Sequence, residues 1–178
     1  AGPDDTICKG DSILIGGIQG NPSSILHVAH WGTLPDTSWL TWADSIWVSP
    51  DTTTNYILVL NDGGLSCFDT AYVTIFVDSV YVDAGVDIGI CEGDSVYLDG
   101  SYWGADSILW RTITNSDGTF NEETDTNAIY SPGPTDINLG IATLAIYTYN
   151  SGACSAITDT ITITISPAIT AYAGPDDF

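Results

Sequence analysis

The chain has almost no basic residues. Lys9 and Arg111 stand against 23 acidic side chains in 178 residues, so the formal net charge is −21. Nucleic acid and anionic membrane surfaces are bound through clustered cations, so we expect neither as a partner. All but three of the acids are aspartates, which favour turns and disfavour helices.

Other absences narrow the function. No apolar run approaches the roughly 18 residues that could cross a bilayer, so membrane insertion is not expected. No nucleophile elbow, phosphate loop or dinucleotide fingerprint is present. The only histidines, His27 and His30, are three apart, and on a strand they would face opposite sides. Glu122 and Glu123 are adjacent and would diverge on an extended chain, so the sequence predicts no enzyme.

A long motif recurs instead. Residues 1–17 return, with substitutions, as residues 84–100, and the motif starts again at residue 173. This period is too long for a solenoid repeat and suits one small β-sandwich. We therefore expect two tandem domains, residues 1–82 and 83–172. Residues 173–178 would begin a next repeat or be donated to a neighbour. Because residue 1 already lies inside the motif, we also expect a processed precursor.

Strand patterns are frequent and helix patterns scarce. In residues 158–165, threonines alternate with Ile161, Ile163 and Ile165, which predicts a strand with one buried face. Residues 70–77 match it, with Tyr72 and Phe76 pointing outward, either as isolated exposed aromatics or as a contact. A helical turn is predicted at 135–139. Further strands are predicted at residues 12–15, 25–31, 55–60, 95–98, 107–112 and 143–149.

The junction at residues 77–86 has no linker rich in proline, glycine or serine, which predicts a stiff connection. The cysteines fall two to a repeat, with separations of 59 and 63 residues. Of the three possible pairings we expect Cys8 with Cys67 and Cys91 with Cys154; free buried thiols are the alternative. Trp31 and Trp110 would pack over these bridges. Disulfides indicate an extracellular setting.

Three further tryptophans, Trp39, Trp42 and Trp47, cluster in the first repeat without a clear counterpart in the second. They form either a contact surface or an enlarged local core, and we favour the core. Exposed tryptophans beside a groove would instead indicate a ligand site.

The opening Ala-Gly-x-Asp-x-x-Ile-Cys-x-Gly-Asp-Ser resembles the PKD-like, immunoglobulin-like repeats of large Bacteroidota surface proteins, including gliding-motility-type adhesins. The likeness continues through Trp110, Gly118-Thr119-Phe120, Ala128-Ile129-Tyr130-Ser131-Pro132, Asp136-Ile137, Cys154-Ser155 and residues 159–163. It covers essentially all of the second repeat and only both ends of the first. The resemblance implies an immunoglobulin-like β-sandwich, export and a structural or adhesive role, without a catalytic site.

Exported proteins of that phylum resemble one another in carrying O-linked sugar at Asp-Ser or Asp-Thr followed by a small or aliphatic residue. The resemblance therefore implies O-glycosylation, although chance also produces such triplets in a β-protein rich in these residues. No Asn-x-Ser/Thr sequon is present. The hydroxyls in matching positions are Thr6, Ser12, Ser45, Thr52, Thr70, Ser79, Ser95, Ser107 and Thr160.

Calcium is the one cofactor that the sequence suggests. Asp78, Asp83 and Asp87 flank the junction, and Asp4, Asp5, Asp176 and Asp177 occupy equivalent outer positions. Hard oxygen ligands could stiffen a rod there. The alternative is solvated turn aspartates, because no Asp-x-Asp-x-Asp-Gly loop is present.

The sequence thus predicts an all-β chain: two tandem immunoglobulin-like (PKD-like) β-sandwich domains plus the first strand of a third. We expect a non-enzymatic, extracellular, O-glycosylated segment of a surface filament or long adhesin, whose partners are copies of itself or adjacent repeats. The alternative is a carbohydrate- or ligand-binding module of a secreted protein, with surface glycans as a partner.

Overall fold

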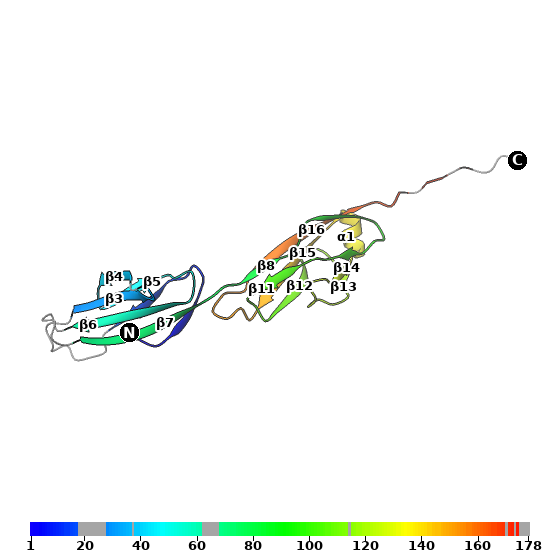
Figure 1. Cartoon of the computed structure of the whole chain (residues 1–178). Helices are drawn as coiled ribbons and strands as arrows, with labels where there is room; N and C mark the ends of the chain where they lie inside the picture. Colours follow the sequence, from blue (N-terminus) through cyan, green and yellow to red (C-terminus); the bar gives the residue numbers. More distant parts are fainter. Residues whose placement is uncertain are drawn as a thin grey trace. The chain divides into compact units, whose positions relative to one another are not determined.

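A computed structural model describes residues 1–17, 28–36, 38–61, 68–113, 115–169, 171–172 and 174. The chain divides into two compact units (Figure 1). Unit 1 contains Ala1–Ser79 together with Gly152–Ser155, and unit 2 contains Val80–Ser151 and Ala156–Phe178. The boundary therefore lies between Ser79 and Val80, and a four-residue segment of the second repeat belongs with the first unit.

Unit 1 is a β-sandwich. Its larger sheet has the order β1-β7-β6-β3-β4, with β1 parallel to β7 and the other pairs antiparallel. Its smaller sheet is the antiparallel pair β2-β5. The strands are β1 (Asp5–Cys8), β2 (Ile13–Gly16), β3 (Val28–Leu34), β4 (Ser38–Trp42), β5 (Ser45–Val48), β6 (Thr54–Asn61) and β7 (Phe68–Asp78).

Unit 2 repeats this plan with additions. Its main sheet has the order β12-β15-β16-β9, beside a sheet β10-β14-β13 and a pair β11-β8. A short helix, α1, packs beside β15 (Figure 1). The elements are β8 (Tyr81–Asp83), β9 (Ile88–Cys91), β10 (Val96–Tyr97), β11 (Ser101–Trp103), β12 (Ser107–Ile113), β13 (Thr119–Phe120), β14 (Ile129–Ser131), α1 (Pro134–Leu139), β15 (Ile141–Tyr149) and β16 (Thr158–Ser166).

The alternating strands form the cores as predicted. In β16, Ile161, Ile163 and Ile165 are buried while the threonines between them point away. In β7, Val73 and Ile75 are buried, and Tyr72 and Phe76 are exposed, as expected. The predicted turn of helix is α1. Several short strands of the structure were not predicted from the sequence. His27, Cys67 and most of residues 173–178 lie outside the described residues.

Each core is built around one tryptophan. Trp31 and Trp110 have no exposed surface, and their indole N–H groups donate to the carbonyls of Ala43 (3.1 Å) and Asp125 (3.0 Å). Such a partner matters because a buried N–H without one costs about 1–3 kcal/mol.

Both units also share a hydrogen bond between an aspartate and their parallel strand pair, β1 with β7 and β9 with β16. The Thr74 amide of β7 donates to Asp4 Oδ1 at 2.7 Å, and the Thr162 amide of β16 donates to Asp87 Oδ1 at 2.8 Å. Asp4 and Asp87 occupy the same position in the repeated motif. The aspartates of the motif therefore have a structural role that follows from the strand pairing.

Candidate interaction sites

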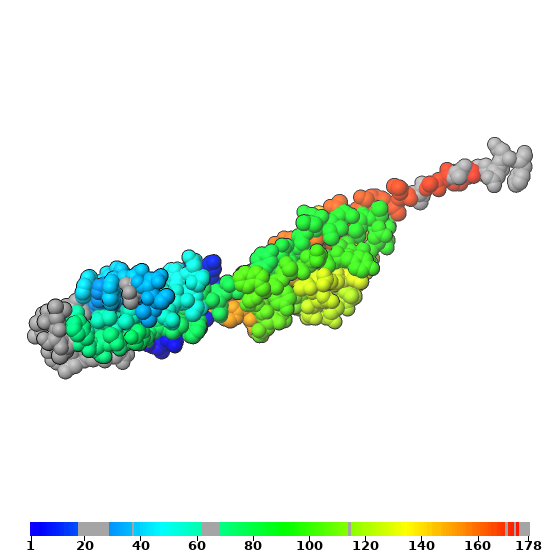
Figure 2. All heavy atoms as spheres, in the orientation of Figure 1, coloured from blue at the N-terminus to red at the C-terminus, as the bar shows by residue number. Residues whose placement is uncertain are grey.

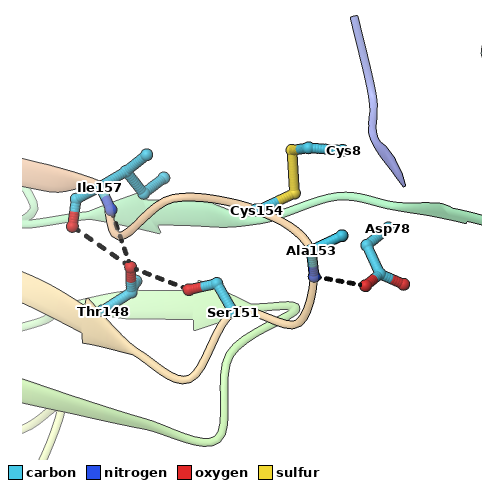
Figure 3. Close-up of a disulfide and its surroundings, with 7 residues drawn as sticks. All are labelled: Cys8, Asp78, Thr148, Ser151, Ala153, Cys154 and Ile157. Carbon is cyan, nitrogen blue, oxygen red and sulfur yellow. Dashed lines mark hydrogen bonds between the residues drawn. A yellow bond between two sulfur atoms is a disulfide. The ribbon is translucent and has the colours of Figure 1, made fainter. Parts of the chain in front are cut away.

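The disulfide does not follow the predicted pairing. Cys8 is bonded to Cys154, with 4.7 Å between the Cα atoms and 146 residues of sequence separation (Figure 3). The expected Cys8–Cys67 and Cys91–Cys154 bridges are therefore both wrong. Cys91 is exposed and has no disulfide partner among the described residues, and Cys67 lies outside them.

The strand geometry explains why a pairing within one repeat fails. Cys91 pairs with Ser166 at the C-terminal end of β16, whereas Cys154 precedes the N-terminal end of that strand. The nine residues of β16 span about 30 Å. A disulfide requires Cα atoms roughly 4.4–6.8 Å apart, so Cys91 and Cys154 cannot meet. The spacing in sequence is similar in the two repeats, at 59 and 63 residues, but does not reveal this separation in space.

The segment that carries Cys154 fits closely in unit 1. Cys154 is 8% exposed, and the amide of Ala153 donates to Asp78 Oδ2 at 2.9 Å (Figure 3). Any side chain at Gly152 would collide with that carboxylate, and Gly152 also has a positive φ of 62°. The disulfide is thus accompanied by a polar contact and a close backbone approach.

The chain on either side of this segment is held by a buried hydroxyl. Thr148 Oγ1, fully buried in β15, accepts from the amide of Ile157 at 2.9 Å and from Ser151 Oγ at 3.4 Å (Figure 3). These hydrogen bonds hold Ser151 and Ile157, which lie on either side of the segment that carries Cys154, to Thr148 of β15.

A second candidate site is an exposed aromatic surface on the larger sheet of unit 1. The His30 ring stacks between Trp39 and Trp42, with ring centroids 4.2 and 3.9 Å apart and interplanar angles of 20° and 14°. The two indoles remain 51% and 61% exposed. Figure 2 shows residues of β3 and β4 (light blue) at the surface of unit 1.

A row of neighbouring side chains continues from this stack across the larger sheet. Gly32 is opposite both Trp39 and Ile57, and Ile57 is opposite Tyr72, which is 59% exposed. We call this row, His30, Trp39, Trp42, Ile57 and Tyr72, the aromatic face. Its residues belong to four adjacent strands, so it forms a row of side chains across the larger sheet.

The expectation that the three clustered tryptophans form a core is therefore wrong. Trp47 is 70% exposed, on β5 of the smaller sheet, and lines a separate open depression of about 300 Å³ with Leu40 and Tyr56. The physical reason is strand alternation: Trp39 and Trp42 lie opposite Gly32 and His30, on the face of the sheet away from buried Trp31, and Trp47 alternates with buried Ile46 and Val48.

The three aspartates named for calcium each have a protein donor. Asp78 accepts from Ala153, Asp87 from Thr162, and Asp83 from the Gly85 amide and the Tyr81 hydroxyl. The Gly85 and Tyr81 hydrogen bonds, in that order, lower the pKa of Asp83. Within the described part of the chain, no three His, Cys, Asp or Glu side chains are grouped as metal ligands.

The hydroxyls proposed for glycosylation lie at accessible positions. All are exposed except Ser45 and Ser79, which are half-buried. In the described residues, no helix has the length and apolar character to cross a membrane.

Comparison with known proteins supports the fold. No protein-family model and no curated protein matches the chain. The structure is similar to extracellular domains 3–5 of Drosophila OTK, with a TM-score of 0.54 and 13% identity over 92% of this chain and 59% of that one. The chain thus spans less than two thirds of that protein.

Two weaker matches are Rst D1-D2 and the N-terminal four Ig domains of Dscam1 isoform 6.9. Their TM-scores are 0.44 and 0.44, with 13% and 9% identity, over 92% and 93% of this chain and 95% and 44% of those chains. At these identities the likeness concerns the fold alone. The chain consists of tandem immunoglobulin-like β-sandwich domains.

Proposed function

We propose that this chain is a non-enzymatic, load-bearing repeat segment of an extracellular surface filament or long adhesin. The repeats would be PKD-like, with residues 1–82 and 83–172 as successive units. The observation that carries the proposal is the Cys8–Cys154 bond, which joins the first cysteine of one repeat to the second cysteine of the next.

The bond closes a ring of chain that contains most strands of both sandwiches, while β16 and most of β1 lie outside it. Tension applied at the two ends passes from Cys8 through the disulfide to Cys154, so residues 9–153 carry none of it. Only the short segments outside the ring are loaded. A filament or adhesin that is pulled by its surroundings gains from this arrangement, because residues 9–153 cannot be extended while the bond is intact.

The setting and surface agree with this function. A disulfide persists outside the reducing cytosol. The net charge of −21 keeps exposed faces soluble and mutually repulsive.

Single-molecule pulling from the two termini tests the proposal. While the disulfide is intact, unfolding releases only chain outside the ring. Adding a reductant, or the change Cys8→Ser, frees 146 residues and adds about 500 Å of extension. Cys91→Ser is the matched control and keeps the wild-type trace. Full-length extension of the oxidised wild-type chain would contradict the load-bearing function.

The proposal includes O-linked sugar on the exposed hydroxyls. Glycans on strand ends would hinder edge-to-edge pairing with neighbouring molecules. Mass spectrometry of native material tests this separately. Added sugar mass on peptides that contain Thr6, Thr70 or Thr160 is expected, and an unmodified chain would remove the glycan from the account.

The aromatic face favours a second function, ligand binding. Half-exposed indoles on the face of a sheet offer stacking surfaces for the apolar faces of sugar rings, and Asn55 and Thr74 on the same sheet supply hydrogen-bonding groups. In this alternative the chain is a carbohydrate-binding module of a secreted protein.

Glycan-array binding with the wild type and the double variant W39A/W42A tests the alternative. Binding that disappears in the variant, with unchanged thermal stability, supports a module. The matched control is Trp103→Ala, which removes a tryptophan of similar exposure, 53%, in unit 2. Equal binding by the wild type, W39A/W42A and Trp103→Ala would contradict the carbohydrate-binding alternative.

A further inference from the structure

Cys91 has the same local structure as the bonded cysteine of the first repeat. In β1, Cys8 lies opposite Asp78 of the parallel strand β7, and in β9, Cys91 lies opposite Ser166 of the parallel strand β16. Both cysteines are the last residue of their strand.

The turns that follow the two cysteines also match, bond for bond. The amides of Lys9 and Glu92 donate to the carbonyls of Asp78 and Ser166, both at 2.8 Å. The amides of Asp11 and Asp94 then donate back to the carbonyls of Cys8 and Cys91, at 2.9 and 3.1 Å. The backbone that presents the sulfur is therefore the same in both repeats.

The surroundings of the two sulfurs differ in one respect. Cys8 is half-buried and bonded to Cys154, whereas Cys91 is exposed and has no disulfide partner among the described residues. Cys91 lies in an open depression of about 610 Å³, whose walls include Ile90, Asp94, Ser95, Tyr97 and Ser166. Tyr97 is 75% exposed there.

We propose that Cys91 forms a disulfide with the second cysteine of the following repeat, as Cys8 does with Cys154. The proposal rests on the function above, in that it needs a following repeat. The occupant of the depression is then the turn equivalent to Gly152–Ser155. Ser166, which stands in the position of Asp78, supplies a hydroxyl acceptor where Asp78 accepts from the amide of Ala153.

The bond forms by oxidation of two thiols. Each sulfur loses a proton, and the pair loses two electrons to a disulfide oxidant, which is reduced to two thiols. Thiolate attack on that oxidant gives a mixed disulfide, and the second thiolate displaces the leaving thiol.

The first repeat of a second copy supplies a matching partner. Cys67 directly precedes β7 in the sequence, as Cys154 precedes β16, so it is the second cysteine of its repeat. A Cys91–Cys67 bond between copies would continue the pattern of Cys8–Cys154. In one continuous chain of repeats, the rings closed by successive bonds of this kind would overlap, so that no stretch of backbone between them would carry tension alone.

The test mixes two full-length variants, Cys67→Ser and Cys91→Ser, at equal concentration in reduced and oxidised glutathione. The first offers only Cys91 and the second only Cys67, while both keep Cys8–Cys154. Cleavage before aspartate puts each cysteine on its own peptide, residues 5–10, 62–68, 87–93 and 136–158. The expected product is a heterodimer in which peptides 62–68 and 87–93 are linked.

Each variant alone is the matched control and is expected to stay monomeric. A Cys91–Cys91 homodimer of the Cys67→Ser chain would overturn the proposal, as would a mixture with no cross-link between the variants. Linked peptides 5–10 and 136–158 in every sample show that the chains are folded. The pulling experiment concerns Cys8–Cys154 alone, so failure of one proposal is distinguishable from failure of the other.

Discussion

At the scale of single residues, the tightest constraints surround the buried tryptophans. A Cβ atom at Gly100 would lie 2.8 Å from Trp110 Cζ2, and at Gly16 it would lie 2.7 Å from Trp31 Cζ2. Real Cβ contacts are longer, so both positions require glycine for the indole to pack beneath the backbone. The two glycines differ by one position in the repeated motif, where Gly16 aligns with Asp99 and Gly100 with Gly17, so each unit makes room for its tryptophan at a different residue.

We predict that Gly100→Ala destabilises the protein by about 1–3 kcal/mol, because the methyl group overpacks a core in which Trp110 cannot move. Gly89→Ala is the matched control, since nothing lies within 4 Å of its Cβ position. Urea unfolding measures both, and equal stability of the two variants would contradict the packing account.

We also predict that Trp110→Phe costs on the order of 2 kcal/mol, from lost volume and from the unpaired carbonyl of Asp125. Trp103→Phe, at a site that is 53% exposed, should change the unfolding free energy by less than about 0.5 kcal/mol. A similar cost at both sites would show that Trp110 does not hold the core of unit 2.

At the scale of elements, α1 is held by a buried carboxylate. Asp136 has no exposed surface, and its Oδ2 accepts from the Tyr130 hydroxyl at 2.6 Å and from the amides of Gly133 and Gly118 at 2.9 and 3.1 Å. This cluster joins α1 to β14 and to the turn before β13. Its formation explains why a six-residue helix is present in a chain otherwise made of strands.

The cluster predicts a pH dependence. Burial, and then the hydrogen bond to Asp136, raises the pKa of Tyr130 well above its ordinary value of 10.0. The folded state therefore keeps this proton when the unfolded state loses it. The stabilisation is fully present below about pH 10 and declines as the pH rises further.

The measurement is the unfolding free energy of wild type and Tyr130→Phe from pH 7 to 11. The wild type should be more stable by about 2 kcal/mol at neutral pH, since the variant lacks the bond to a charged acceptor. The difference should narrow above pH 10. A constant difference across this range would contradict the raised pKa.

Much of the strand pattern was predictable from sequence, because successive side chains on a strand point to opposite faces of the sheet. The alternation in β7 and β16 identifies buried Ile75 and Ile163 and exposed Tyr72 without any tertiary information. The exposure of Trp39 and Trp42 was not predictable, because it depends on which residues of β3 they lie opposite, and the register of that pair is irregular between Trp31 and Gly32. The row that joins Tyr72 to Trp39 depends on strand order, which local patterns do not encode.

At the scale of the whole molecule, the cysteine pairing was the largest departure from expectation. Nearly equal spacing within each repeat favours a bridge within each repeat, but parallel pairing of β9 with β16 puts Cys91 and Cys154 toward opposite ends of β16. The correct pairing needs the second repeat as well as the first. A disulfide between two repeats cannot be recognised from the cysteine spacing within one repeat.

The bridge also predicts a stability difference. A ring of 146 residues is worth about 5 kcal/mol in the chain-entropy model. Cys8→Ser should therefore lower the midpoint of guanidinium unfolding, whereas Cys91→Ser, at an exposed cysteine, should leave it unchanged. Equal midpoints for the two variants would mean that Cys8 is not cross-linked in the folded chain.

The most direct test of the central claim is a disulfide map of the oxidised wild-type chain. Cleavage before aspartate under non-reducing conditions should yield peptide 5–10 joined to peptide 136–158, which contain Cys8 and Cys154. Peptide 5–10 joined to 62–68, or 87–93 joined to 136–158, would place the bonds within single repeats and contradict the account.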